Sequence, residues 1–245
     1  MELKEIILLV LVGTGASFVQ RVSGFGLGIF AMLFLPHFMA VPTAAASVSN
    51  LFSCVTSSYN GIKYRKNISF PIVWPMLLAA MVSIPIAVRF SGAISGEVFS
   101  VILGVVLILL SGYFIFFGQR IRFRATKAKG VLTGCCGGVL NGLFSTGGPP
   151  IVLYLTNATD DPHIYFASIQ FYFAVTNIYA VVFRVINGFV TWQVLGYTAV
   201  GLVGCFLGDF IGRKVYNKLD AKRIKQIIYI AMIFSGIIMI VKNAT

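Results

Sequence analysis

Two short segments place glycines and small polar residues inside otherwise apolar sequence. The first reads QRVSGFGLG at residues 20–28, and the second reads NGLFSTGGPP at residues 141–150. Glycine and proline interrupt a helix, and an interrupted helix exposes backbone N–H groups that can donate to a ligand. Pro149 and Pro150 suit the first turn of a new helix, whose positive dipole end would face the break. These segments therefore predict the binding of an anion without an obligatory charged side chain.

Hydroxyl and amide side chains add donors near both segments. A polar stripe at helical spacing runs through residues 43–57, and Gln170 and Asn177 share a helix face two turns apart. Asn50 and Gln170 are expected to contact a ligand, because each falls near the middle of its helix. The alternative is that these side chains only hold helices together. The expected substrate-binding residues are Arg21, Ser23, Gly24, Phe25, Gly26, Asn50, Asn141, Ser145, Thr146, Gly147, Gly148, Gln170 and Asn177.

Other glycines and charged residues are expected to have structural roles. Gly134, Gly137 and Gly138 have the spacing of close helix packing. For Arg21 two interpretations stay open: a functional cation in the membrane, or a side chain that reaches the membrane surface. Arg89 and Arg184 lie near predicted helix ends and are expected to reach the surface. Asp209 precedes Arg213 by four residues, which favours a structural ion pair over an ion-coupling carboxylate.

Enzymatic chemistry finds little support in these residues. Asp209 is the one carboxylate expected within the membrane, and neither His37 nor His163 is expected at mid-span. Two histidines are too few for a metal site, and the four cysteines lie in apolar segments without a C-x-x-C pair. No catalytic residue, metal ion or cofactor is therefore expected, and an enzyme is the least favoured class.

The elements that position these residues are membrane helices. Of the 245 residues, 58% are hydrophobic and 11% are charged, whereas about a quarter of a soluble domain is charged. Runs such as 98–117 and 224–241 are long enough to cross a bilayer as helices. The expected fold class is an all-α polytopic membrane protein. Eight apolar units are predicted at 5–39, 41–60, 70–90, 97–118, 130–158, 164–187, 191–212 and 224–241.

Basic residues predict how these units cross the membrane. Most of the 19 basic residues fall in the segments 63–66, 120–129 and 213–225, a placement typical of cytoplasmic loops rather than of nucleic-acid binding. If every unit crossed once, the third segment would lie outside. If units 5–39 and 130–158 are re-entrant hairpins, all three segments lie inside and both termini lie outside. Each half then has a broken hairpin followed by three transmembrane helices, and the halves are inverted repeats.

An internal duplication accounts for the two similar breaks. At an offset of 122 residues, Ser23 aligns with Ser145 and Gly26 aligns with Gly148. The predicted repeats are residues 1–118 and 119–245, within one integral membrane domain. The expected partners are a small anionic substrate and the lipid bilayer, with a homodimer left open.

Three stretches resemble one known family over essentially the whole chain. SGFGLGIFAMLFLP and NGLFSTGGPPIVLYL resemble the Gly-rich signatures of the TauE/SafE sulfite-exporter-like family, also called the toluene-sulfonate uptake permeases. The stretch from LVGCFLGDF to SGIIMI is similar to the closing part of that family. The resemblance implies a bacterial plasma-membrane secondary transporter, often an exporter, of small sulfur anions such as sulfite, sulfoacetate or other sulfonates. A passive anion channel and a permease for carboxylates are the alternatives, and proton coupling is an open question.

Overall fold

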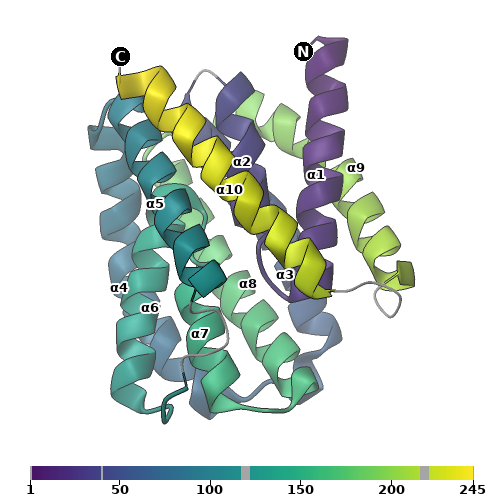
Figure 1. The fold of residues 1–245 in the computed structure, drawn as a ribbon, viewed down its shortest axis with the longest axis vertical. Helices are drawn as coiled ribbons and strands as arrows, with labels where there is room; N and C mark the ends of the chain where they lie inside the picture. Colours follow the sequence, from purple (N-terminus) through teal and green to yellow (C-terminus); the bar gives the residue numbers. More distant parts are fainter. Residues whose placement is uncertain (1, 40, 117–121, 216–220, 245) are drawn as a thin grey trace.

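The described part of the chain is helical throughout. The computed structural model describes residues 2–39, 41–116, 122–215 and 221–244 (Figure 1). Besides α-helices, these ranges contain one short 3₁₀ helix, η1 (Arg65–Asn67), which lies between α3 and α4. The α-helices are α1 (Leu3–Ser23), α2 (Leu27–Phe38), α3 (Pro42–Lys63), α4 (Phe70–Ala93), α5 (Gly96–Phe116), α6 (Lys127–Phe144), α7 (Gly148–Ala158), α8 (Pro162–Ile186), α9 (Trp192–Val215) and α10 (Ala221–Ala244).

Five of the described helices are long and apolar enough to cross a membrane. They are α1, α4, α5, α8 and most of α9. Large apolar side chains such as Val82 and Ile86 on α4 are mostly exposed, as lipid-facing residues are. The expectation of an all-α, multi-pass membrane protein is confirmed. α3 falls outside this set because of the polar stripe through 43–57, whose residues Ser47, Asn50 and Ser57 are fully buried in the protein.

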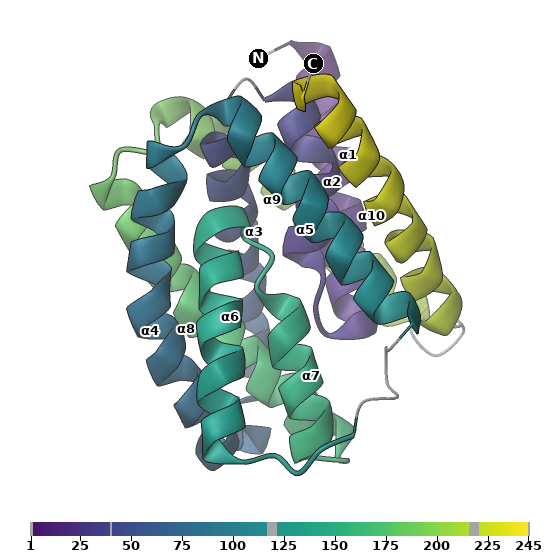
Figure 2. The same cartoon turned by 60° about the vertical axis from the view of Figure 1, so that its left-hand side comes forward.

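The two predicted breaks are helical hairpins that open in opposite directions. α1 runs inward from the end that carries both termini, and α2 returns to that end (Figure 1). α6 and α7 enter and leave at the other end (Figure 2). The turns lie at 24–26 and 145–147, inside the predicted breaks. Each of these two helix pairs therefore places its turn inside the helical bundle instead of at a surface.

Close helix contacts fix the position of both hairpins. α1 packs along α9, and α6 packs along α4. A Cβ atom added at Gly13 would lie 2.2 Å from the carbonyl oxygen of Gly201, and one added at Gly134 would lie 2.2 Å from that of Met76. The packing role expected for Gly134 is therefore confirmed, because no larger residue fits there.

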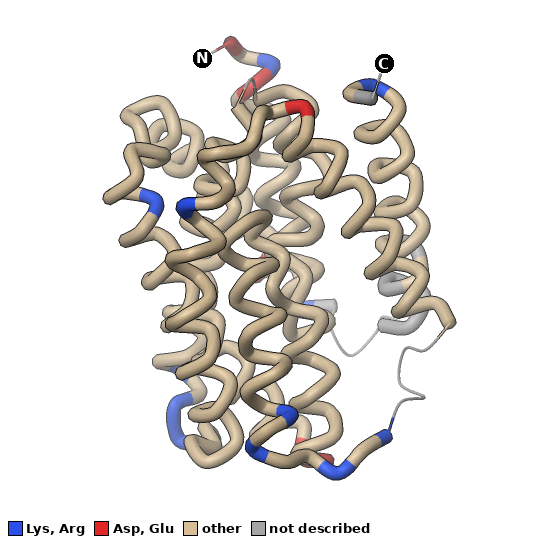
Figure 3. The backbone as a smooth tube through the Cα atoms, turned by 90° about the vertical axis from the view of Figure 1, so that its left-hand side faces the viewer, with Lys and Arg blue, Asp and Glu red and all other residues tan. Residues whose placement is uncertain are grey.

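The basic segments gather away from the chain termini. The turn after α3 and the segment before α6 carry Lys and Arg at the end of the bundle opposite both termini (Figure 3). Arg213 and Lys214 lie in the last turn of α9. Arg120 and Lys218 lie outside the described residues, as do the side chains of Lys222, Arg223 and Lys225.

Candidate functional site

The two breaks meet inside the bundle. A Cβ atom added at Gly28 would lie 1.8 Å from the carbonyl oxygen of Ser145, so the start of α2 touches the turn before α7. A Cβ atom added at Gly148 would lie 3.3 Å from Cδ2 of Phe25. Segments from opposite halves of the chain thus form one site.

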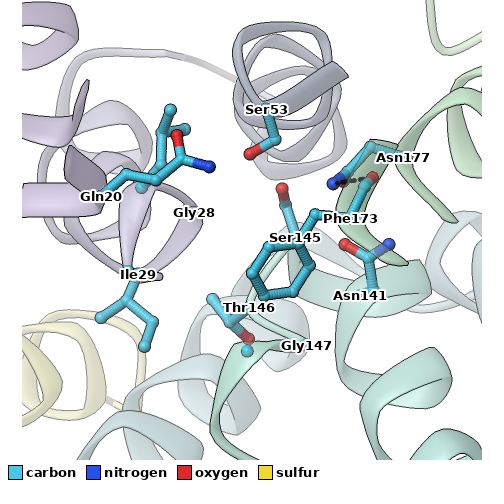
Figure 4. A pocket seen from close by; sticks show the side chains of 13 residues that line it. Gln20, Gly28, Ile29, Ser53, Asn141, Ser145, Thr146, Gly147, Phe173 and Asn177 are labelled. Carbon is cyan, nitrogen blue, oxygen red and sulfur yellow. Dashed lines mark hydrogen bonds between the residues drawn. The ribbon is translucent and has the colours of Figure 1, made fainter. Parts of the chain in front are cut away.

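A small cavity of about 20 Å³ lies between the breaks (Figure 4). This volume holds about one water molecule, so a larger ligand requires the helices to move apart. None of the described residues that line the cavity is acidic or basic. The lining residues are Gln20, Gly26, Leu27, Gly28, Ile29, Ser53, Asn141, Ser145, Thr146, Gly147, Gly148, Phe173 and Asn177.

Two helices begin at the cavity. Gly26 precedes the first residue of α2, and Gly147 precedes the first residue of α7. The first N–H groups of a helix have no partner within that helix, and they carry its positive dipole end. Pro149 and Pro150 occupy the first turn of α7 and contribute no N–H, which leaves the glycines beside them as its backbone donors. Both helix starts therefore favour negative charge in the cavity.

Two buried polar atoms of the cavity wall have no hydrogen-bond partner among the described residues. They are Nδ2 of Asn141 and Oγ1 of Thr146, and these side chains are 6% and 1% exposed. Buried polar groups are nearly always paired, and an unpaired one costs about 1–3 kcal/mol. A ligand with acceptor oxygens would pair both atoms.

A hydrogen-bonded network from α3 and α8 lies behind Asn141. Nδ2 of Asn50 donates to Oδ1 of Asn141 at 3.1 Å and to Oδ1 of Asn177 at 2.8 Å. The oxygen of the Asn50 amide accepts from Nε of Arg184 at 2.7 Å. Nη2 of Arg184 also donates to the carbonyl oxygen of Gly142 at 2.7 Å. Asn50 and Asn177 thus hold the wall together, and Asn177 also lines the cavity.

A second network supports the first break. Nε2 of Gln20 donates to Oγ of Ser57 at 2.9 Å and to Oε1 of Gln170 at 3.2 Å. Oε1 of Gln20 accepts from the hydroxyl of Thr56 at 3.0 Å. Nε2 of Gln170 donates to the carbonyl oxygen of Gly24 at 2.9 Å. Both polar atoms of the Gln20 amide are therefore paired, whereas only the oxygen of the Asn141 amide is paired.

The serine hydroxyl groups of the two breaks also differ in whether a donor is left for a ligand. The Ser23 hydroxyl donates to the carbonyl oxygens of Val19 and Phe25, so it stabilises its own turn. The Ser145 hydroxyl accepts from the hydroxyl of Ser49 at 2.9 Å. Ser145 can therefore still donate its own proton into the cavity.

Arg21 faces away from the cavity. Its Nη2 donates to the hydroxyl of Tyr64 at 3.1 Å, and its guanidinium carbon lies 5.3 Å from the ring centroid of Phe166. Asp209 and Arg213 form the expected ion pair on α9. Neither Arg21 nor this ion pair reaches the cavity wall, so these groups contribute no charged side chain to it.

More of the expected residues line the cavity at the second break than at the first. Asn50 and Gln170 do not line the cavity, but each hydrogen-bonds to a residue that does. Arg21, Ser23, Gly24 and Phe25 do not line it either. Gln20, Ser53 and Phe173 line the cavity although they were not expected to; the position of Gln20 inside the first break was the available signal. The expected residues that line the cavity are Gly26, Asn141, Ser145, Thr146, Gly147, Gly148 and Asn177.

Arg184 requires a correction. Its position near the end of α8 predicted a side chain that reaches the surface, but the side chain is 0% exposed. Its guanidinium group instead turns inward to Asn50 on α3 and to the last turn of α6. Contacts between distant segments decide its direction, and position along one helix does not reveal them.

Comparison with known proteins identifies one protein family. The family model described as Sulfite exporter TauE/SafE matches residues 9–239. Neither the curated proteins nor the solved structures contain a match to the chain. Because the family match covers nearly the whole helical bundle, including both breaks, the chain belongs to the TauE/SafE family of membrane transporters.

Proposed function

We propose that the protein is a secondary transporter that exports small sulfur-containing anions, such as sulfite or sulfonates, across the bacterial inner membrane. The observation that carries this proposal is the cavity between the two breaks. Helix starts from both halves point at it, and two unpaired buried polar atoms, Asn141 Nδ2 and Thr146 Oγ1, lie on its wall. The family match supports the choice of a sulfur anion.

The chemistry of the wall suits an oxyanion. A sulfonate group carries three oxygens that only accept hydrogen bonds at neutral pH, and the sulfite dianion has the same three acceptor oxygens. The wall offers the Asn141 amide N–H, the hydroxyl groups of Ser145 and Thr146 and backbone N–H groups at Gly147 and Gly148. Several donors converge from different directions, as recognition of a compact anion requires.

Alternating access would operate through two inverted repeats, residues 1–118 and 119–245. The two hairpins open to opposite ends, and Asn50 and Gln170 each lie eight residues after the proline that begins α3 or α8. Inverted repeats around a central site are a common transporter design. In this scheme, a cavity of such small volume would belong to a closed arrangement of the two repeats. The basic segments would then face the cytoplasm and both termini the outside.

Sulfite flux in proteoliposomes tests this function. The purified protein is reconstituted, loaded with sulfite, and assayed for efflux of labelled sulfite with and without unlabelled sulfite on the other side. A carrier is accelerated by substrate on the far side, whereas a passive channel is not. Absence of sulfite flux while acetate exchanges would contradict the sulfur substrate and favour a carboxylate permease.

A matched pair of variants links this flux to the cavity. Gly148→Val adds bulk beside Phe25 and Phe173, where the nearest atoms lie 3.3 and 3.6 Å from an added Cβ. Gly112→Val adds the same bulk on α5, where an added Cβ meets nothing within 4 Å. We expect Gly148→Val to abolish exchange and Gly112→Val to preserve it. Equal exchange in both variants would place the transport route elsewhere.

A further inference from the structure

Arg184 is a buried cation outside the cavity wall. Arg184 is 0% exposed, and all of its hydrogen-bond acceptors among the described residues are neutral, the nearest being Oδ1 of Asn50 and the carbonyl oxygen of Gly142 at 2.7 Å each. A buried charge without a countercharge is costly, and inside a membrane such a residue is a functional candidate. The cost of burying this charge therefore suggests that Arg184 has a functional role.

The donors of Arg184 determine how the neighbouring amides are oriented. Arginine donates hydrogen bonds and accepts none, so the atom of Asn50 beside Nε must be its oxygen. The Asn50 nitrogen is then left to donate to the oxygens of Asn141 and Asn177. With its oxygen engaged, Asn141 has only Nδ2 left, and this is the buried atom without a partner.

We propose that Arg184 is the positioning residue that makes the site select anions over neutral ligands. It acts through Asn50, which turns the Asn141 amide so that a donor, and not an acceptor, is available to the ligand. It also places a fixed positive charge behind Asn50, which itself bonds the wall residue Asn141. The inference rests on the proposed function only in that the ligand is an anion, and it does not depend on which anion is transported.

The contact between Arg184 and α6 also favours an anion in the cavity. The carbonyl oxygen of Gly142 belongs to the last turn of α6, where the helix dipole is negative. Arg184 binds this oxygen at the point where α6 ends and α7 soon begins. It thereby offsets the negative end of α6, so the positive start of α7 dominates the field at the break.

Two variants separate this role from a purely structural one. Arg184→Gln removes the charge. Asn50→Asp keeps the size of the side chain and can form an ion pair with Arg184, but it cannot donate to Asn141 and it cancels the positive charge. Because Asn50→Asp supplies a countercharge to a buried arginine, we expect it to fold even if Arg184→Gln does not. Arg89→Gln is the matched control, because Arg89 is an exposed arginine near the end of α4.

The measurement is the preference for an anion over its neutral amide. Calorimetry on folded, purified protein compares methanesulfonate with methanesulfonamide and acetate with acetamide. We expect the wild type and Arg89→Gln to prefer the anion, and Asn50→Asp and folded Arg184→Gln to lose that preference by roughly tenfold or more, or about 1.4 kcal/mol. Affinity for the neutral amide should change little, whereas general damage to the site would weaken both ligands.

The outcomes distinguish this inference from the proposed function. A folded Asn50→Asp protein that keeps the wild-type preference would overturn the role of Arg184. A wild type that prefers neither anion over its amide would overturn it as well. A wild type that binds acetate but not methanesulfonate would overturn the sulfur substrate alone, and the acetate pair would then decide the role of Arg184.

Discussion

The break between α1 and α2 turns at two glycines, whereas the break between α6 and α7 turns at a serine. Gly24 and Gly26 have φ of 82° and 97°, and Ser145 has φ of 59°. A left-handed backbone costs a residue with a side chain about 1–2 kcal/mol, but costs glycine little. The second break thus accepts backbone strain and keeps a hydroxyl group on the cavity wall. Strain of this kind is typical of functional sites.

The amides behind the two breaks differ in the same sense. Gln20 and Asn141 both lie near the end of the helix that precedes a break, and each bonds an amide on α3 or α8. The Gln20 network ends in fully paired atoms, whereas the Asn141 network ends in an unpaired donor. From this difference we propose a division of labour, in which the first break supports the site and the second supplies most side-chain donors to the ligand.

The largest expected effect comes from separating the two breaks. Gly28→Ala would place a Cβ 1.8 Å from the Ser145 carbonyl oxygen, a contact that the backbones can relieve only by moving apart. We expect loss of sulfite exchange together with a lower unfolding temperature. Gly196→Ala, where an added Cβ meets nothing within 4 Å, serves as the control and should leave both quantities unchanged. Normal exchange by Gly28→Ala would show that contact between the breaks is not required.

The second effect contrasts two buried threonines. The Thr146 hydroxyl is unpaired, whereas the Thr56 hydroxyl donates to Gln20. Thr146→Val removes a possible ligand donor without breaking a bond in the free protein, so sulfite affinity should fall by about tenfold while the unfolding temperature stays constant or rises. Thr56→Val should do the reverse, with a loss of about 1 kcal/mol in stability and a small change in affinity. Thermal unfolding and calorimetry on both variants check this. If both variants changed sulfite affinity and unfolding temperature in the same way, the proposed distinction between the two breaks would be wrong.

The sequence predicted some of this contrast and could not predict the rest. Glycine and proline identified both turns, because the helix-breaking properties of these residues are local. The unpaired state of Asn141 and the buried direction of Arg184 depend on which helices lie opposite them, and α3 and α8 come together from residues far apart in the chain. The role of Gln20 was missed for the same reason, since its partners Ser57 and Gln170 lie on those two helices.

A smaller effect is expected from the serines that align between the two halves. Ser145→Ala should weaken sulfite binding by roughly 0.5–1.5 kcal/mol, the usual net value of one hydrogen bond. Ser23→Ala should leave affinity unchanged and lower the unfolding temperature, because the Ser23 hydroxyl bonds only its own turn. Calorimetry on the two folded variants checks the difference. A larger loss of affinity in Ser23→Ala than in Ser145→Ala would reverse the proposed division of labour.

The smallest effect on transport is expected outside both breaks. Asp209 and Arg213 form an ion pair on α9 near its end. Asp209→Asn should lower the yield of folded protein modestly and leave the pH profile of sulfite exchange unchanged. Exchange rates measured at acidic, neutral and alkaline pH test this. A well-folded Asp209→Asn protein without the pH dependence of the wild type would make Asp209 a coupling residue.

The central claim is that a sulfur anion binds between the two breaks, mainly against the second. A crystal structure with selenite, which replaces the sulfur of sulfite with an anomalous scatterer, tests it most directly. We predict one selenium peak between Gly28 and Gly148, with the selenite oxygens within hydrogen-bond distance of Nδ2 of Asn141 and Oγ1 of Thr146. A selenium peak elsewhere in the bundle, with these two atoms still unpaired, would contradict the claim.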